Sequence, residues 1–220
     1  MPTKHVFVET NWIVDCCAPQ PFRVPEATEL LKKAGAGEVI LHLPGICLKE
    51  ARNTIRKRFQ PRNQLNPLRS YLRWAKANGK IDEQAEAAVR ETFDQFEKQV
   101  VGELDQLEIT LQEFANQPGV TTFPLSEAML ERSLSLTYER LDLNPFDTVL
   151  LGAVLTRAAD LKAQEAEGEL FFCELDSDLQ PWDKHGNPKP ALKQLYDNAR
   201  VWVYGDFAMT SHERPEDWQR

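Results

Sequence analysis

Short apolar segments alternate with helix-like segments along most of the chain, and this alternation restricts the fold more than any other feature. The apolar segments hold four to six residues, which is typical of strands. Helices between consecutive strands act as crossovers, so the strands lie parallel and both faces of their sheet are covered. The sequence therefore predicts an α/β fold, a three-layer α/β/α arrangement around a central, mostly parallel sheet. The expected strands are 5–8, 39–43, 120–125, 170–175 and 201–204.

Helices are expected where the apolar spacing changes from strand-like to helical. Pro25 opens the first of them and Gly35 ends it. The second carries Leu48, Ala51 and Ile55 along one stripe. The expected helices are 25–35, one that begins near 48, one from 126, one from 144, and 189–198.

The stretch 61–118 departs from this rhythm. Apolar residues recur every three or four positions in its second half, which predicts a long amphipathic helix or a helical hairpin. A single apolar stripe has to pack on another surface, so we interpret 61–118 as an insertion between the second and third strands. The whole chain, 1–220, is then one domain, with a polar C-terminal tail at about 206–220 that is expected to fray.

Charge is distributed unevenly along the chain. The formal net charge of −8 and the pI near 5.1 differ from the basic balance of most nucleic-acid-binding domains. The segment 49–80 nevertheless carries ten basic residues and one acid, whereas 82–113 carries ten acids and two basic residues. Net charge alone is therefore a poor guide to partners.

The basic segment admits two interpretations. Its cations can contact phosphates while its aromatic side chains stack on unpaired bases of RNA. Alternatively, the cations form a solvated face that pairs with the acidic segment, and the aromatic residues anchor a helix. The candidate nucleic-acid-binding residues are Arg52, Arg56, Arg62, Arg69, Arg73, Tyr71 and Trp74.

Cysteine usage and the N-terminus indicate a protein that is not exported. The four cysteines lack the paired spacing of a zinc site, so we expect them to be reduced and buried. The first residues reach a glutamate too soon for a secretory signal, and no stretch approaches the roughly 20 apolar residues of a membrane span. A cytoplasmic protein with no membrane contact is expected.

Two common site types find no support in the sequence. The four histidines are scattered, and no serine or cysteine lies in a nucleophile-elbow pattern, which argues against an acyl-transfer triad. The glycine-rich loops of nucleotide-binding sites are also missing from the sequence.

Carboxylates follow two of the expected strands. Glu9 comes directly after the first strand, and Asp176 and Asp178 follow the strand 170–175. Ligand sites of open parallel sheets lie beyond the carboxyl ends of the strands. We therefore expect these acids at a site on that edge.

Asp147 is the most informative acid. Asn144 is a suitable N-cap, which puts Asp147 in the first helical turn. On a helical wheel with Leu150 at 0°, Asp147 falls at about 60°, between Val154 and Ala158. A first-turn acid favoured by the helix dipole is the simpler interpretation. An acid on the buried face, however, needs a cation or a strong donor, because burying an unpaired carboxylate costs several kcal/mol, in order of magnitude.

Glu50 has two interpretations. It lies near the start of the helix that follows the second strand, where it can reach the strand edge. The apolar stripe of that helix points roughly the other way, so Glu50 is equally well a solvated acid beside Lys49 and Lys57.

Four motifs around these acids together resemble the PIN-domain nuclease family. The likeness covers the α/β core, about 5–60 and 120–204, and leaves the insertion unexplained. Glu9 stands where the family usually has aspartate, and Glu174 where it usually has threonine or serine. The segment 180–183 is not part of the family pattern either. The motifs are Val6-Phe7-Val8-Glu9-Thr10-Asn11, Leu48-Lys49-Glu50-Ala51, Asn144-Pro145-Phe146-Asp147-Thr148-Val149-Leu150 and Leu175-Asp176-Ser177-Asp178-Leu179.

The resemblance implies a PIN-like domain with a metal site built from these acids. Converging carboxylates repel each other by about 4 kcal/mol per pair at 4 Å and an effective dielectric near 20, which a divalent cation relieves. Hard ions with oxygen ligands, Mg²⁺ or Mn²⁺, suit this donor set. By resemblance, one or two ions are held by Glu9, Glu50, Asp147 and Asp176, with Asp178 as a second-site or outer ligand. Thr10 and Asn11 then orient water or phosphate, or are simply turn residues.

The activity that the resemblance implies is phosphodiester hydrolysis, usually of RNA. The chain is expected to be a metal-dependent endoribonuclease acting on single strands, and many small relatives are the toxins of toxin–antitoxin pairs. An antitoxin or another protein partner and self-association into a homo-oligomer belong to the same expectation. The alternative is a catalytically impaired PIN-fold scaffold that binds RNA or protein, which the glutamate at position 9 favours.

Overall fold

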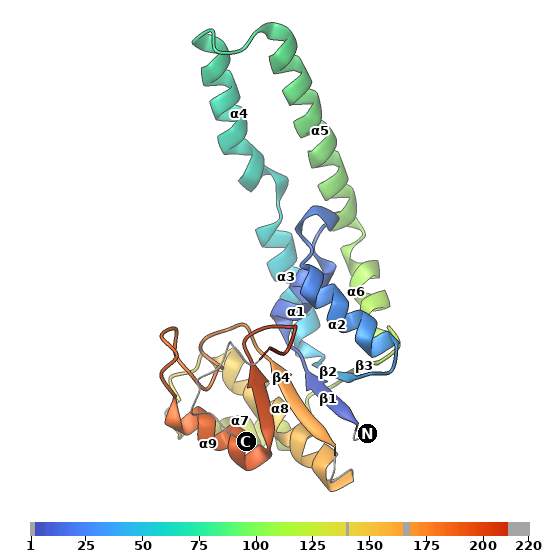
Figure 1. Ribbon diagram of the computed structural model, residues 1–220, viewed down its shortest axis with the longest axis vertical. Coiled ribbons are helices and arrows are strands. Elements are labelled where there is room, and N and C mark those ends of the chain that lie inside the picture. The colour runs from blue at the N-terminus through green and yellow to red at the C-terminus, as the bar shows by residue number, and fades with distance from the viewer. Residues whose placement is uncertain (1–2, 140, 165–167, 211–220) are drawn as a thin grey trace.

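The computed structural model describes residues 3–139, 141–164 and 168–210. Five strands in these ranges form one sheet in the order β3-β2-β1-β4-β5, and every neighbouring pair is parallel. The first strand is therefore central, and later strands add on both sides of it (Figure 1). The strands are β1 (Lys4–Phe7), β2 (Ile40–Pro44), β3 (Val120–Phe123), β4 (Glu169–Cys173) and β5 (Val201–Tyr204).

Helices cover both faces of this sheet, which gives the three-layer α/β/α fold that the alternation predicted (Figure 1). One group consists of α1 (Thr10–Cys17), α2 (Pro25–Gly35), α3 (Ile46–Arg58) and α6 (Leu107–Ala115). The other group consists of α7 (Glu127–Thr137), α8 (Pro145–Gln164) and α9 (Pro190–Ala199). A short 3-10 helix, η1 (Gln20–Phe22), joins α1 to α2.

The core lies between the layers. Val6 and Phe7 of β1 are fully buried, as are Leu41 of β2 and Phe172 of β4. Removing apolar side chains of this kind from water is the main driving force for folding. The buried central strands therefore hold the carboxyl edge of the sheet rigidly, and that edge carries the acids.

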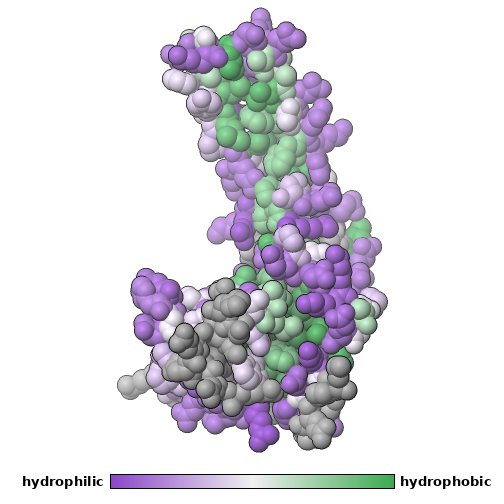
Figure 2. Space-filling view, viewed as in Figure 1, coloured by the Kyte–Doolittle hydropathy of each residue, from purple (hydrophilic) through white to green (hydrophobic). Residues whose placement is uncertain are grey.

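The stretch 61–118 forms three helices. α4 (Pro61–Ala77) and α5 (Glu83–Asp105) lie side by side and project from the sheet-containing body; we call this pair the arm (Figure 1). An apolar band follows the visible face of the arm (Figure 2). α6 then returns to the body, where it contacts α1 and α3. The acidic half of this stretch, whose spacing predicted a long amphipathic helix or a hairpin, contains the long helix α5 followed by α6, and the hairpin is the one that α5 forms with α4.

Helix α1 was not predicted. Thr10, Ile13 and Val14 are β-branched and weaken the helical signal. Glu9 nevertheless caps the helix, since its carboxylate accepts a hydrogen bond from the backbone N–H of Asn11 at 2.7 Å. The interpretation of Thr10 and Asn11 as turn residues is therefore wrong, because both lie in the first helical turn.

The other expected elements are present, with ends that differ by up to two residues. Of the expected polar tail, 211–220 lies outside the described residues. Thr210, just before it, donates to Asp206 from its backbone N–H at 3.2 Å and from its hydroxyl at 2.7 Å. No helix within the described ranges is long and apolar enough to cross a membrane.

Candidate metal centre

Glu9 stands at the carboxyl end of the central strand and is almost completely buried, with 4% of its surface exposed. One oxygen, Oε2, accepts the hydrogen bond from Asn11 that caps α1. The other, Oε1, is buried and has no hydrogen-bond partner among the described residues. Burying an unpaired carboxylate oxygen is costly, so this atom requires a ligand or a proton.

Glu174 occupies the matching position on the neighbouring strand. Phe7 of β1 pairs with Phe172 of β4, and each glutamate lies two residues beyond its phenylalanine. Glu174 is fully buried, and its Oε1 accepts a hydrogen bond from the backbone N–H of Asp176 at 2.7 Å. Its Oε2 is buried without a hydrogen-bond partner in the described part of the chain. The sequence reasoning noted Glu174 only as a departure from the family pattern and missed it as a site residue.

Asp147 lies in the first turn of α8 and is buried, with 6% of its surface exposed. Asn144 holds it from both sides. The Asn144 side-chain N–H donates to Asp147 Oδ2 at 2.5 Å, and the Asp147 backbone N–H donates to Asn144 Oδ1 at 3.0 Å. The wheel position of Asp147 predicted this burial, which is confirmed.

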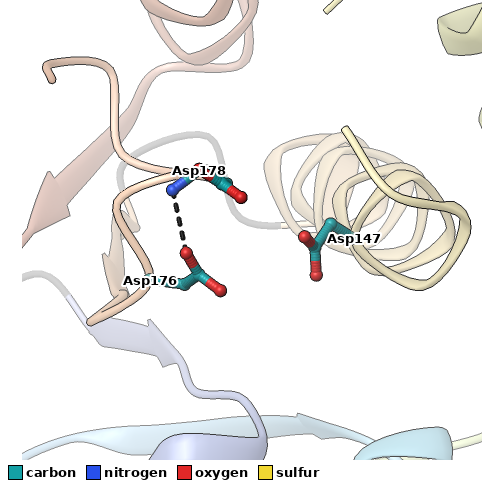
Figure 3. A group of neighbouring side chains, drawn as sticks. All are labelled: Asp147, Asp176 and Asp178. Atoms are coloured by element: carbon teal, nitrogen blue, oxygen red, sulfur yellow. Dashed lines mark hydrogen bonds between the residues drawn. The ribbon is translucent and has the colours of Figure 1, made fainter. Parts of the chain in front are cut away.

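Asp176 and Asp178 follow β4 on a loop and are exposed. The Asp178 backbone N–H donates to Asp176 Oδ1 at 2.9 Å. One carboxylate oxygen from each of Asp147, Asp176 and Asp178 lies within 4.8 Å of the other two, which is close enough to hold one metal ion. Figure 3 shows the loop acids turned toward Asp147 across the space that separates them from α8.

Glu50 reaches the site from α3. It is half-buried, and its Oε2 accepts a short hydrogen bond of 2.5 Å from the hydroxyl of Thr10. The sequence left two interpretations of Glu50 open, a site residue and a solvated acid. The contact with Thr10 instead ties it to α1, so the interpretation as a solvated acid beside Lys49 and Lys57 is wrong.

These side chains line a single cavity of about 120 Å³ at the carboxyl edge of the sheet. The expected residues that share it are Glu9, Thr10, Asn11, Glu50, Asp147 and Asp176, and Glu174 joins them. Asp178 stands beside the cavity as part of the aspartate triad. Among the described residues that line the cavity, none is a lysine or an arginine.

The proton affinities of the acids follow from this crowding. Burial raises the pKa of Glu9 to about 8, and the charges of Glu50 and Asp176 add to that shift. Burial also raises the pKa of Asp147 to about 6, with a further contribution from Asp176. The pKa of Glu174 lies well above its usual value because the side chain is buried beside Glu9.

The donor set fits a hard divalent cation. It consists of carboxylate oxygens, the ligand type that Mg²⁺ and Mn²⁺ prefer, and two of these oxygens are buried without a partner among the described residues. A cation there would compensate the buried charges and relieve the repulsion that adds to the effect of burial on the three pKa values. The cluster can therefore bind a divalent cation of this kind.

Comparisons with known proteins leave the family undecided. No model of a known protein family matches this chain, and no curated protein matches it significantly. The resemblance to PIN-domain nucleases therefore stays a prediction from the motifs.

Three of the candidate nucleic-acid-binding arginines form ion pairs with the acidic segment. Arg52 and Arg56 on α3 both pair with Glu108 of α6. Arg69 on α4 pairs with Asp94 at 2.9 Å and with Glu97 of α5 at 2.7 Å. For these three residues, the alternative of a basic face paired with the acidic segment is confirmed.

The remaining candidates on the arm are more accessible. Tyr71 and Trp74 are 65% and 52% exposed, and their rings stack on each other with centroids 5.6 Å apart. The interpretation that they anchor a helix is therefore wrong. Arg73 donates to the Ser70 hydroxyl at 3.2 Å and pairs with no carboxylate of the described residues, while Arg62 is exposed at the start of α4.

Proposed function

We propose that this protein is a metal-dependent phosphodiester hydrolase, specifically an endoribonuclease that acts on single-stranded RNA. One observation carries the proposal: acids from four separate segments share a small cavity at the carboxyl edge of a parallel sheet. No basic residue lines that cavity in the described part of the chain. Such a cluster is unfavourable by itself and favourable with a divalent cation.

The acids have distinct tasks in this proposal. Glu9, Glu50, Asp147 and Asp176 hold Mg²⁺ or Mn²⁺, with Asp178 beside them. When bound, the ion lowers the pKa of a coordinated water and neutralises charge on the scissile phosphate. The Thr10 hydroxyl fixes the orientation of Glu50 through their 2.5 Å hydrogen bond.

Neutral groups complete the site. Asn11 lines the cavity, and in this proposal its side-chain amide donates a hydrogen bond to a phosphate oxygen. Phe146, Leu150 and Leu179 form the apolar part of the wall. A partly apolar wall excludes bulk water, which strengthens electrostatic interactions in the site.

The test is cleavage of labelled single-stranded RNA by the full chain, with Mg²⁺, Mn²⁺ or EDTA. We expect cleavage with either ion and none with EDTA. Asp147→Asn should reduce the rate by at least about a hundredfold, since even outer-shell partners of a metal site are worth about 10–100-fold. Asp160→Asn is the matched control, because Asp160 lies exposed on the same helix. Absence of cleavage with every divalent ion, or full activity of Asp147→Asn, contradicts the proposal.

A second candidate function is a scaffold that binds RNA or protein with impaired catalysis. The stacked and exposed Tyr71–Trp74 pair favours it, because the pair offers aromatic surface on the arm. Tight RNA binding without metal-dependent cleavage would support this candidate. A role as the toxin of a toxin–antitoxin pair, with an antitoxin bound to it, stays a prediction from the resemblance, as do self-association and a cytoplasmic location.

A further inference from the structure

We propose that Glu9 and Glu174 form an inner divalent-cation site, separate from the position that Asp147, Asp176 and Asp178 share. The inference rests on the proposed function, since both positions belong to the same metal centre. It assigns a ligand role to Glu174, and it predicts two ions bound in different surroundings.

The two glutamates are equivalent in the fold. They follow adjacent parallel strands at matching register positions, two residues beyond the paired Phe7 and Phe172. Each uses one oxygen to accept the backbone N–H of the residue two positions later, Asn11 or Asp176, at 2.7 Å. Each has its other oxygen, Glu9 Oε1 and Glu174 Oε2, free of hydrogen bonds to described residues. The sheet thus places two glutamates of the same kind at the ends of neighbouring strands, and both line the same cavity.

Burial makes these two oxygens different from ordinary surface acids. Glu9 is 4% exposed and Glu174 is 0% exposed, so bulk water does not solvate their charges. Both line the cavity, and no lysine or arginine of the described chain lines it with them. Two buried carboxylates without a counter-charge repel each other strongly, and a divalent cation between them removes the repulsion.

The cavity has room for this ion. Its volume of about 120 Å³ exceeds the roughly 30 Å³ that one water molecule occupies in the liquid. An ion together with a few coordinated waters therefore fits. Mg²⁺ and Mn²⁺ keep several waters when a protein supplies few ligands.

Asp176 lies where the inner position meets the outer one, since it lines the cavity with the two glutamates and belongs to the aspartate triad. Its backbone N–H donates to Glu174, while its side chain accepts from the Asp178 N–H and faces Asp147 (Figure 3). The oxygens within 4.8 Å of one another belong to the three aspartates, two of which are exposed. The outer position is thus open to solvent, and the inner one is enclosed.

The experiment counts Mn²⁺ ions bound to the full chain in the absence of RNA, by isothermal titration and by electron paramagnetic resonance of free Mn²⁺. The wild type should bind two ions. Glu174→Gln keeps the shape of the side chain and an acceptor for the Asp176 N–H, and it should weaken one ion at least tenfold while the other remains. Asp178→Asn should weaken the other ion instead.

Two further variants make the result unambiguous. Glu9→Gln tests the inner position from the neighbouring strand and should weaken the same ion as Glu174→Gln. It also keeps the inference testable if Glu174→Gln folds poorly. Glu86→Gln is the matched control, because Glu86 is a buried glutamate that Lys76 and Arg90 already neutralise. It should leave both ions bound as in the wild type.

The outcomes separate this inference from the proposed function. If the wild type binds Mn²⁺ and Glu174→Gln binds the same number of ions with the same affinities, the inner site does not exist, while the metal centre stands. If Glu174→Gln loses both ions at once, the two positions are not separate and the inference also fails. If the wild type binds no divalent ion, the proposed function fails with it.

Discussion

Buried glutamates in this protein fall into two kinds, which differ in how their charge is compensated. Glu86 is bound by Lys76 and by Arg90 at 2.6 Å, and these cations lower its pKa. Glu9 and Glu174 have no such cation beside them among the described residues, and burial raises the pKa of both. The two kinds of glutamate therefore differ in their partners, since both kinds are buried.

Opposite effects on stability are expected from neutralising these two kinds of acid. Glu86→Gln should lower the melting temperature, because Lys76 and Arg90 lose their common partner. Asp147→Asn, measured in EDTA, should leave the melting temperature unchanged or raise it, since it removes repulsion with Asp176. Differential scanning calorimetry of both variants checks the pair. A large destabilisation by Asp147→Asn in EDTA would show that its charge is already compensated.

The pH dependence of stability follows from the raised pKa values. A carboxyl group whose pKa is higher in the folded state contributes stability below its unfolded pKa, and loses it as the pH rises through the folded pKa. Glu9, raised from 4.5 to about 8, and Asp147, raised from 3.8 to about 6, define the window. In EDTA, we expect the free energy of unfolding to fall between about pH 3.8 and about pH 8, by several kcal/mol in order of magnitude.

Urea unfolding across this range measures the effect. Glu9→Gln should flatten the upper part of the profile, because that side chain no longer titrates. With saturating Mn²⁺, the free energy of unfolding should instead rise with pH, since metal binding requires ionised carboxylates. A profile in EDTA that rises toward pH 8 would contradict the account.

At the scale of elements, the arm combines a basic helix with an acidic one. Arg69 on α4 forms ion pairs with Asp94 and Glu97 of α5, so its charge stabilises the contact between the two helices of the arm. Arg73 has no carboxylate partner among the described residues, and Arg62 is exposed. Arg62 and Arg73 can therefore contact a phosphate without losing a carboxylate partner among the described residues.

Charge reversal separates these two roles. Arg62→Glu with Arg73→Glu should weaken binding of single-stranded RNA and reduce the salt dependence of log K by about one for each phosphate that is no longer neutralised. Arg69→Gln should instead lower the melting temperature, with less effect on the salt dependence. Fluorescence anisotropy at several salt concentrations measures both. If the double variant and the wild type bind RNA with equal affinity, the arm is not part of the RNA-binding surface.

The sequence predicted some elements of the site better than others, for physical reasons. Asp147 could be placed because it falls among the apolar positions of a 20-residue helix that the fold largely buries, and an acid among such positions has to be buried. α1 was missed because its eight residues include three β-branched ones and directly follow a strand. Glu50 was ambiguous because a helical wheel describes one helix, whereas its partner Thr10 belongs to another.

Glu174 had a signal in the sequence that was overlooked. The pattern Phe-x-Glu occurs at the carboxyl ends of both β1 and β4, as Phe7-Val8-Glu9 and as Phe172-Cys173-Glu174. The pattern acquires meaning only when β1 and β4 are known to be neighbours in register. Strand order and register depend on the whole chain, which is why local periodicity did not identify this pair.

At the scale of the whole molecule, the fold could be predicted almost completely. Alternation of strands and helices requires a parallel sheet with covered faces, and the sheet order β3-β2-β1-β4-β5 puts the strands that precede Glu9 and Glu174 side by side. The projecting arm could be recognised as an insertion, but its direction could not, because that direction depends on packing between residues far apart in the sequence.

The proposed metal centre depends on one arrangement, in which acids from distant segments surround a cavity that holds divalent cations. Anomalous diffraction at the manganese absorption edge, from crystals grown with Mn²⁺, tests it most directly. The account predicts anomalous density in the cavity between Glu9, Asp147 and Asp176, with Glu174 at its inner end. A well-ordered cavity without anomalous density, in crystals that bind manganese at other places, would contradict it.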